Sequence, residues 1–336
     1  MAAQQDDRDY CFITTRLRSL ENRMLNRERI EMILEADNLE EAAKILQECG
    51  YEEISDFSTQ GLENALSEER EKIFREVAFF SPDPRLLDVF RVKYDYHNAK
   101  VLLKSEALGL APQRLLSQAG RIPAQQLSQA LLTSNFIGIP LTMQYAIVEA
   151  REVLGTTRDP QVADSILDRA YYAEMYELAR QTASAFLLDY VRISIDAANL
   201  KSAVRSARIG KGAEFLRSML HEGGSIEAGR VVELMLSGAS VEDFYAVTIL
   251  KEAAALAQTV LLEGGAAEVT EFERLADNAV SAYLAKARYV PFGEQPVIFH
   301  LAAREVEFTT VRIIISGLTA GIAPEIIRER LREIYV

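Results

Sequence analysis

DYHNAKVLLKSEALG, residues 95–109, decides the fold of this chain because two later stretches repeat its skeleton. These are DAANLKSAVRSARIG, which starts at Asp196, and EFTTVRIIISGLTAG, which starts at Glu307. Each copy begins with an acid, continues with Asn or Thr and then a cation, and ends at Gly. The matching positions are Asp95, Asn98, Lys100 and Gly109 in the first copy, Asp196, Asn199, Lys201 and Gly210 in the second, and Glu307, Thr310, Arg312 and Gly321 in the third. A period of roughly one hundred residues is too long for a solenoid unit and predicts three similar subdomains, around a shared axis or in a row.

The repeated stretch has a helical geometry. At about 100° per residue, the acid, the Asn or Thr and the Gly share one face of a helix, and the cation lies on another side. The shared face indicates packing against a neighbouring element through hydrogen bonds. Two other interpretations stay open: the acid and amide bond within their own turn or to a nearby loop, and the glycines are helix C-caps. The cations form a separate stripe that is either solvated surface or a contact for a partner.

The composition favours an all-α protein. Gly is 17 and Pro 9 of the 336 residues, so residues that break helices are scarce. Leu, Ala and Ile recur at three- and four-residue spacing, and no series of alternating β-branched runs is present. A chain of this length exceeds the size of most single cores. We therefore expect three helical repeats, spanning residues 1–111, 112–222 and 223–336.

Several helix starts can be read from their capping residues. Residues 12–36 indicate one or two amphipathic helices. An acid, amide or hydroxyl side chain that precedes a first-turn proline or a later acid is typical of an N-cap. Such pairs are Asn38 with Glu41, Asp83-Pro84, Asp159-Pro160 and Ser240 with Asp243, and Ala323-Pro324 indicates the start of the last helix.

Charge and cysteine content exclude several classes of protein. A net charge of −13 argues against a nucleic-acid binder that neutralises phosphates. The longest apolar stretches are interrupted by charges and are too short to span a membrane, and the start of the chain lacks a secretion signal. Cys11 and Cys49 have no metal-like spacing, which is typical of a reduced cytoplasmic setting. We expect a soluble cytoplasmic protein without a membrane span.

Motifs for chemistry are missing from the sequence. Gly210-Lys211-Gly212 lacks the upstream glycine and the following hydroxyl of a nucleotide-binding loop. His97, His221 and His300 lie far apart, and none has the spacing of a metallohydrolase. No activated serine or cysteine is present. The sequence therefore predicts no catalytic site, no metal and no cofactor.

Three tracts carry a resemblance to a known family. They are FRVKYDYHNAKVLLKSEALG (90–109), DYVRISIDAANLKSAVRSARIGKG (189–212) and AREVEFTTVRIIISGLTAGIAPEIIRERLREIYV (303–336). With the start YCFITTRLRSLENRMLNRERIEMIL, they resemble the C subunit of V-type and A-type rotary ATP synthases, the counterpart of the d subunit of eukaryotic V-ATPases. The resemblance covers essentially the whole chain.

The resemblance implies a fold, a function and partners. Members of that family are all-helical and funnel-shaped, with three similar subdomains around a pseudo-threefold axis. They have no catalytic site and lie at the cytoplasmic face of the membrane as peripheral subunits. A central depression accepts the central shaft of the soluble head, and the other side sits on the membrane ring of proteolipid subunits. The resemblance thus implies a rotor socket that couples ATP synthesis or hydrolysis to ion transport.

A hypothesis about contact residues follows from the repeat. If Lys100, Lys201 and Arg312 point toward the shared axis, replacing all three with Glu should weaken binding of the shaft. Two other functions remain open. A general helical scaffold would have the same composition, and a helical enzyme would bring His97, His221 and a carboxylate together in a deep pocket.

Overall fold

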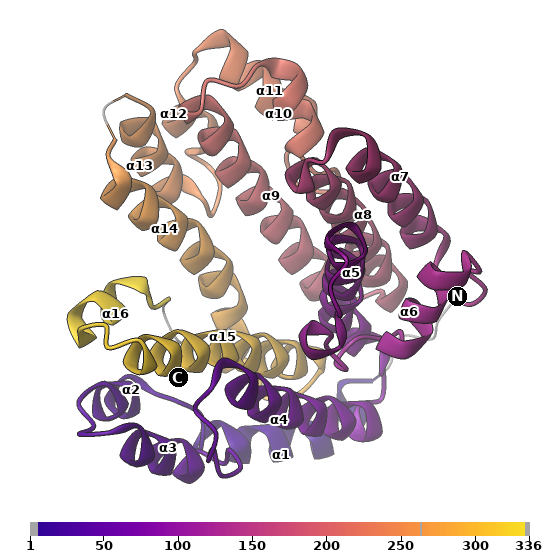
Figure 1. The fold of residues 1–336 in the computed structure, drawn as a ribbon. Coiled ribbons are helices and arrows are strands. Elements are labelled where there is room, and N and C mark those ends of the chain that lie inside the picture. The colour runs from indigo at the N-terminus through magenta and orange to yellow at the C-terminus, as the bar shows by residue number, and fades with distance from the viewer. Residues whose placement is uncertain (1–5, 263, 333–336) are drawn as a thin grey trace. The chain divides into compact units, whose positions relative to one another are not determined.

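The computed structural model describes residues 6–262 and 264–332 of the chain (Figure 1). Every regular element in these two ranges is helical, which confirms the expected all-α class. The chain divides into two compact units, residues 1–87 with 281–336, and residues 88–280. The division falls inside two helices, α5 (Arg85–Leu108) and α14 (Ala266–Ala285). The three ranges expected from the repeat stay a prediction.

The first unit is assembled from both ends of the chain. Its helices are η1 (Asp7–Tyr10), α1 (Cys11–Glu21), α2 (Arg27–Leu34), α3 (Leu39–Glu48), α4 (Thr59–Phe80), η3 (Lys286–Tyr289), α15 (Glu294–Thr319) and α16 (Pro324–Arg330). Helix α15 forms its centre and packs against α1, α2, α3, α4 and α16. In Figure 1, the yellow α15 lies across the indigo α2, α3 and α4. Residues 296–304 are all buried, and apart from His300 and Arg304 they are apolar on every side of the helix.

The second unit is built around α9 (Ala185–Arg208), which packs against α8, α10, α11 and α13. Leu200 of α9, Tyr245 and Phe272 are fully buried in one apolar cluster of this unit. The other helices are most of α5, η2 (Gln113–Leu115), α6 (Ala124–Thr133), α7 (Leu141–Thr157), α8 (Pro160–Thr182), α10 (Ala213–Met219), α11 (Ala228–Ser237), α12 (Val241–Tyr245), α13 (Lys251–Leu262) and most of α14.

The capping residues start helices where the sequence predicts. Asn38 accepts a hydrogen bond from the Glu41 N–H at 2.9 Å, and Ser240 accepts one from the Asp243 N–H at 3.1 Å. Asp159 caps α8 in the same way. Each side chain satisfies a backbone donor that the first helical turn leaves without a partner. No described helix is both long and apolar enough to cross a membrane.

Candidate functional site

The three repeated acids bind equivalent loops. Asp95 accepts a hydrogen bond from the Ile122 N–H at 3.0 Å, and Asp196 accepts one from the Ile226 N–H at 3.1 Å. Glu307 accepts one from the Leu25 N–H at 2.8 Å. Each donor lies two residues before the first residue of a short helix, α6, α11 or α2. The repeat is thus a repeat of contacts as well as of sequence, and its third copy joins α15 to the N-terminal part of the chain.

The residue three positions after the acid holds the same loop in the first two copies. Asn98 donates to the Ser117 carbonyl and accepts from the Ser117 N–H, both at 2.8 Å. Asn199 makes the same pair of bonds with the main chain of His221, also at 2.8 Å. Thr310 is buried but has no amide with which to make such a pair. The acid and the amide therefore bond to a neighbouring loop, which is one of the alternatives that the sequence left open.

The length of each acid matches the residue that faces it. A Cβ on Gly120 or on Gly224 would lie under 3.0 Å from a carboxylate oxygen of Asp95 or Asp196, respectively. Gly120 and Gly224 each stand two residues before the loop donor, where the third copy has Arg23. The third copy pairs this larger residue with Glu307, whose carboxylate reaches one methylene farther. The change from Asp to Glu thus accompanies the loss of glycine in the loop.

A half-buried arginine bridges two acids in the first copy. Arg121 donates to Asp95 at 2.8 Å and to Glu174 of α8 at 2.6 Å. Tyr96 donates its hydroxyl to the other oxygen of Glu174 at 2.8 Å. Burial raises the pKa of Asp95, and the Ile122 N–H and Arg121 offset this effect in part. The loop, α5 and α8 are thereby joined through one charged cluster.

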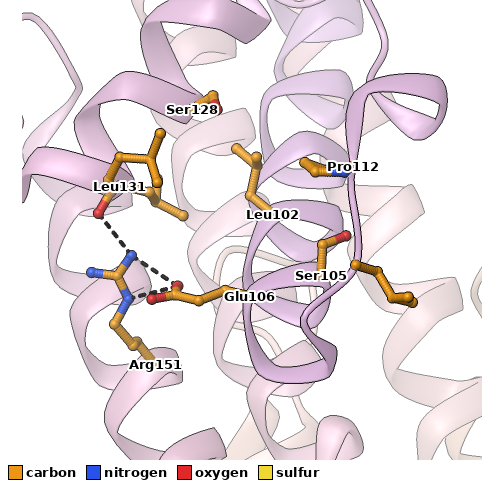
Figure 2. A pocket seen from close by; sticks show the side chains of 9 residues that line it. Leu102, Ser105, Glu106, Pro112, Ser128, Leu131 and Arg151 are labelled. Atoms are coloured by element: carbon orange, nitrogen blue, oxygen red, sulfur yellow. Dashed lines mark hydrogen bonds and ion pairs between the residues drawn. The ribbon is translucent and has the colours of Figure 1, made fainter.

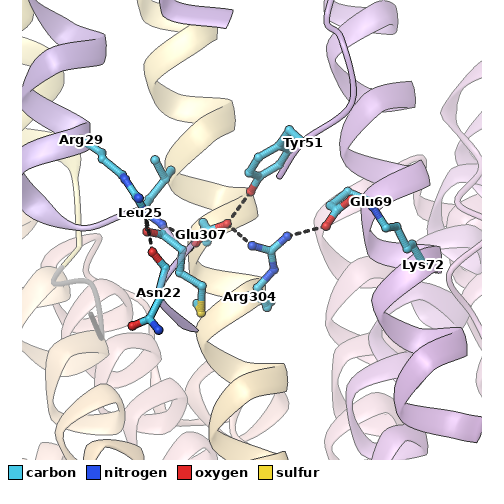
Figure 3. Close-up of polar contacts among 9 residues, drawn as sticks. Asn22, Leu25, Arg29, Tyr51, Glu69, Lys72, Arg304 and Glu307 are labelled. Atoms are coloured by element: carbon cyan, nitrogen blue, oxygen red, sulfur yellow. Dashed lines mark hydrogen bonds and ion pairs between the residues drawn. The ribbon is translucent and has the colours of Figure 1, made fainter. Parts of the chain in front are cut away.

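The third copy has a similar bridge with the arginine on a different element (Figure 3). Arg304 of α15 donates to Glu307 of the same helix and, at 2.9 Å, to Glu69 of α4. Tyr51 donates its hydroxyl to Glu307 at 2.7 Å. The guanidinium also lies over the ring of Phe308, 5.3 Å from its centroid. Because a buried charge is costly without partners, this cluster holds α15, α4 and the loops around them in one arrangement.

The second copy lacks both parts of the bridge. Asp196 accepts from the N–H groups of Ser225 and Ile226, at 3.0 and 3.1 Å, and no arginine is hydrogen-bonded to it in the described chain. Ser225 stands at the position of Arg121, and Tyr283 stands six residues after Asp277, where the other copies have Glu174 and Glu69. The arginine and the second acid are thus present together or absent together, so each copy has one more acid than arginine in this cluster.

The cations of the repeat pair with acids on a second long helix. Lys100 bonds to Asp168 of α8 at 2.5 Å, and Lys201 bonds to Asp277 of α14 at 2.6 Å. Arg312 bonds to Glu63 of α4 at 2.8 Å. The side chains of the three cations are 24%, 24% and 39% exposed, so each remains partly accessible. We call these three contacts the seam ion pairs.

The three repeat glycines end their helices. Gly109, Gly210 and Gly321 have φ values of 65°, 66° and 68°, the left-handed region that favours glycine. In each case the next residue donates its N–H to the carbonyl five residues earlier, as in the Schellman motif. A Cβ at any of the three would meet no atom within 4 Å. The glycines therefore cap the helices and do not provide a close approach between backbones.

The histidines and cysteines form no site in the described residues. His97 is exposed and contacts the Leu115 carbonyl, whereas His221 is buried against Tyr172, with the two ring centroids 4.3 Å apart. Burial lowers the pKa of His221 to about 4 and that of His300 to about 3. No group of His, Cys, Asp and Glu side chains with metal-site geometry occurs in the ranges described. Cys11 and Cys49 are free thiols.

The sequence pattern did not reveal the partners of the repeat. Asp168, Asp277 and Glu63 lie outside the repeated stretches, and so do the bridging acids Glu69 and Glu174. One signal was present. Glu63 and Glu69 have the same spacing as Asp168 and Glu174, because both pairs are six residues apart on a long helix.

Comparison with known proteins finds relatives that match nearly the whole chain. A family model described as ATP synthase (C/AC39) subunit matches residues 13–330. The C subunit of the V-type sodium ATPase of Enterococcus hirae is 26% identical, and the match covers 97% of this chain and 99% of that protein. The C subunit of the A-type ATP synthase of Thermococcus kodakarensis is 23% identical over 97% of this chain and 91% of its own. The C subunit of the A-type ATP synthase of Methanocaldococcus jannaschii is 24% identical over 96% of this chain and 86% of its own.

Proposed function

The chain belongs to the family of ATP synthase (C/AC39) subunits, and from this premise we propose that it couples the two sectors of a V-type or A-type rotary ATPase. In this proposal it is a non-catalytic subunit of the central stalk. It receives the central shaft of the soluble head on one side and sits on the membrane proteolipid ring on the other. Nucleotide and ions bind to other subunits. The observation that carries the proposal is the match to the family over nearly the whole chain.

The internal contacts support a mechanical role. A subunit that transmits torque has to resist bending, and long packed helices joined by buried polar groups resist it well. Helices α5, α9 and α15 are each bound to a loop by the repeat acid and to a second long helix by a seam ion pair. The same connection thus occurs three times along the chain.

We extend the proposal to the arrangement of the repeats. Three equivalent sets of contacts suit three subdomains around a pseudo-threefold axis, in a funnel whose central depression holds the shaft. The third subdomain would draw on both ends of the chain, since Glu307 binds Leu25. The subunit would lie on the cytoplasmic face of the membrane as a peripheral component.

The seam ion pairs suggest how the cations take part. We propose that Lys100, Lys201 and Arg312 face the shaft and offer their remaining hydrogen-bonding capacity to its acidic or carbonyl groups. Replacing the three with Glu would also break bonds within the chain, since each cation already binds an acid. A weaker complex could then reflect a damaged helix pair.

A charge exchange separates these two effects. Lys100→Asp with Asp168→Lys, and Lys201→Asp with Asp277→Lys, keep opposite charges in contact across the seam but move each cation to the neighbouring helix. If the cations contact the shaft, purified shaft subunits bind the exchanged protein roughly tenfold or more weakly, which corresponds to about 1.4 kcal/mol. Unchanged binding, measured by calorimetry on proteins of equal thermal stability, rules out the cation contact and leaves the coupling role to be tested separately.

A further inference from the structure

Helix α7 has a second apolar face that the described part of the chain leaves uncovered. Met143, Ile147 and Ala150 are buried against the rest of the second unit. On another side Leu141, Tyr145 and Val148 are 65%, 72% and 53% exposed. Their spacing of four and three residues places the three side chains in one line along the helix. We call Leu141, Tyr145 and Val148 the α7 stripe.

A recess reaches α7 at Arg151, three residues after the last residue of the α7 stripe (Figure 2). Its volume is about 270 Å³, and its walls come from the end of α5, the segment after it, α6 and α7. Arg151, one turn beyond Val148, lines the recess and donates to the Leu131 carbonyl at 3.0 Å and to Glu106 at 3.1 Å. Leu102 and Pro112 line it as well. The recess is thus held open by fixed polar bonds at one end.

The internal repeat provides a comparison for the α7 stripe. Helix α3 follows α2 as α7 follows α6, and α2 and α6 both start two residues after a loop donor to a repeat acid. On α3 the exposed positions carry Glu40, Lys44 and Gln47. A helix in this position of the repeat therefore does not need an apolar outer face, and the exposed apolar line on α7 calls for a different explanation.

The charges around the stripe indicate what would cover it. Glu149 and Glu152 are exposed on the same helix, directly beside and beyond Val148. The cation nearest to the stripe on α7, Arg151, is engaged by Glu106. An apolar line with acidic neighbours complements an amphipathic helix that carries Lys or Arg next to its apolar residues.

We propose that the α7 stripe and the adjoining recess bind a basic amphipathic helix of a partner protein. The stripe would meet the apolar face of that helix, a side chain from it would enter the recess, and Glu149 and Glu152 would pair with its cations. This surface is separate from the seam ion pairs, so the proposal adds a docking site to the socket function and does not depend on it.

The test uses model peptides and the full chain. A fluorescent peptide of about 14 residues, with Leu and Lys arranged so that one helical face is apolar, serves as the probe. A second peptide has Glu in place of every Lys. Fluorescence anisotropy should show that the wild-type chain binds the Leu/Lys peptide. Tyr145→Ser and Leu141→Ser should each weaken this binding by roughly tenfold, because aromatic and apolar anchors dominate such contacts. Neither substitution alters the charge of the protein, so general attraction between opposite charges cannot produce this loss.

Matched controls make the outcome decisive. Val247 is 97% exposed in the same unit but lies off the stripe, and Val247→Ser should leave peptide binding unchanged. The double variant Glu149→Gln, Glu152→Gln should bind the Leu/Lys peptide more weakly than the wild type, and this binding should depend less on salt. Equal affinity of the stripe variants and the wild type, or equal affinity for the Leu/Glu peptide, would overturn the proposal.

Two other occupants would also overturn it. If sedimentation velocity shows a dimer that Leu141→Ser dissociates, the stripe is covered by a second copy of the chain. If the chain binds vesicles of phosphatidylcholine and phosphatidylglycerol, and Tyr145→Ser releases it, the stripe meets a lipid surface. Far-UV circular dichroism on each variant verifies that the helices are intact. Loss of helix in one variant leaves the test to the other, since Leu141 and Tyr145 are substituted separately.

Discussion

Glu307 of α15 accepts a hydrogen bond at 2.8 Å from the backbone N–H of Leu25, which stands 282 residues earlier in the chain. The corresponding bonds of Asp95 and Asp196 reach loops that follow them by 27 and 30 residues. The third copy of the repeat is therefore closed by the N-terminal part of the chain. Because Glu307 also binds Arg304 and Tyr51, this one carboxylate joins several elements of the first unit.

Glu307→Gln should destabilise the protein by about 2–4 kcal/mol, because Arg304 then loses a charged partner in a buried site. Glu307→Asp should also destabilise it, since the shorter side chain does not reach the Leu25 N–H. Thermal unfolding and urea titration measure the change in stability of both variants. Glu329→Gln, an exposed position on α16, serves as the control and should change stability by less than about 0.5 kcal/mol. Equal stability of Glu307→Gln and Glu329→Gln would contradict this account of the cluster.

Gly120→Ala and Gly224→Ala should each cost about 1–3 kcal/mol, because the new methyl group would overlap the carboxylate of Asp95 or Asp196. Gly155→Ala is the matched control. It lies inside α7 with no atom within 4 Å of an added Cβ, so Ala should stabilise the helix by about 0.5–1 kcal/mol. The two groups of variants are thus expected to shift the melting temperature in opposite directions. A stabilising effect at Gly120 or Gly224 would contradict the close contact.

Replacing Gly109, Gly210 or Gly321 with Ala should destabilise the chain by about 1 kcal/mol at each position, since a Cβ disfavours a positive φ. Asn tolerates this region better than Ala and should cost less. Because the sites are open, steric overlap makes no contribution. The comparison of Ala with Asn at each glycine, by thermal unfolding, distinguishes a capping role from a packing role.

Stability should fall as the pH drops from about 6.5 toward 4. Burial lowers the pKa of His221 to about 4, below its ordinary value of 6.5, so the unfolded chain binds a proton in this range that the folded chain does not. His300, with a pKa of about 3, acts in the same direction. Burial raises the pKa values of Asp95, Asp196 and Glu69, and these acids act in the opposite direction. Melting temperatures at pH 7.5 and 5 should differ less for His221→Gln than for the wild type, and an unchanged difference would exclude His221 as a source.

The sequence predicted the helices well because capping and periodicity are local. Asn38, Asp159 and Ser240 start helices as expected, and the repeat glycines terminate theirs. The contacts of the repeat were harder to predict, because a carboxylate on one helix face does not reveal which distant loop will reach it. The first two copies pair Asp with a loop glycine, Gly120 or Gly224, whereas the third pairs Glu307 with Arg23. This relation becomes visible only after the loops are aligned by their hydrogen bonds.

The family resemblance added what local patterns could not. Composition and the missing motifs pointed away from an enzyme but not toward any one assembly. The tracts around Asp95, Asp196 and Glu307 resembled one family over the whole chain, and the match of the family model to residues 13–330 bears this out. The sequence did not reveal the bridging arginines, because Arg121 lies in a loop and Arg304 lies on the helix itself, so the two do not align in the repeat.

The coupling role is tested most directly by removing this chain from cells that produce it and isolating their membranes. The account predicts that the ATPase head detaches and that ATP no longer drives ion transport into membrane vesicles, while the released head still hydrolyses ATP. Restoring the wild-type chain should restore both attachment and transport. A head that stays on the membrane and drives transport at the wild-type rate without this chain would contradict the account.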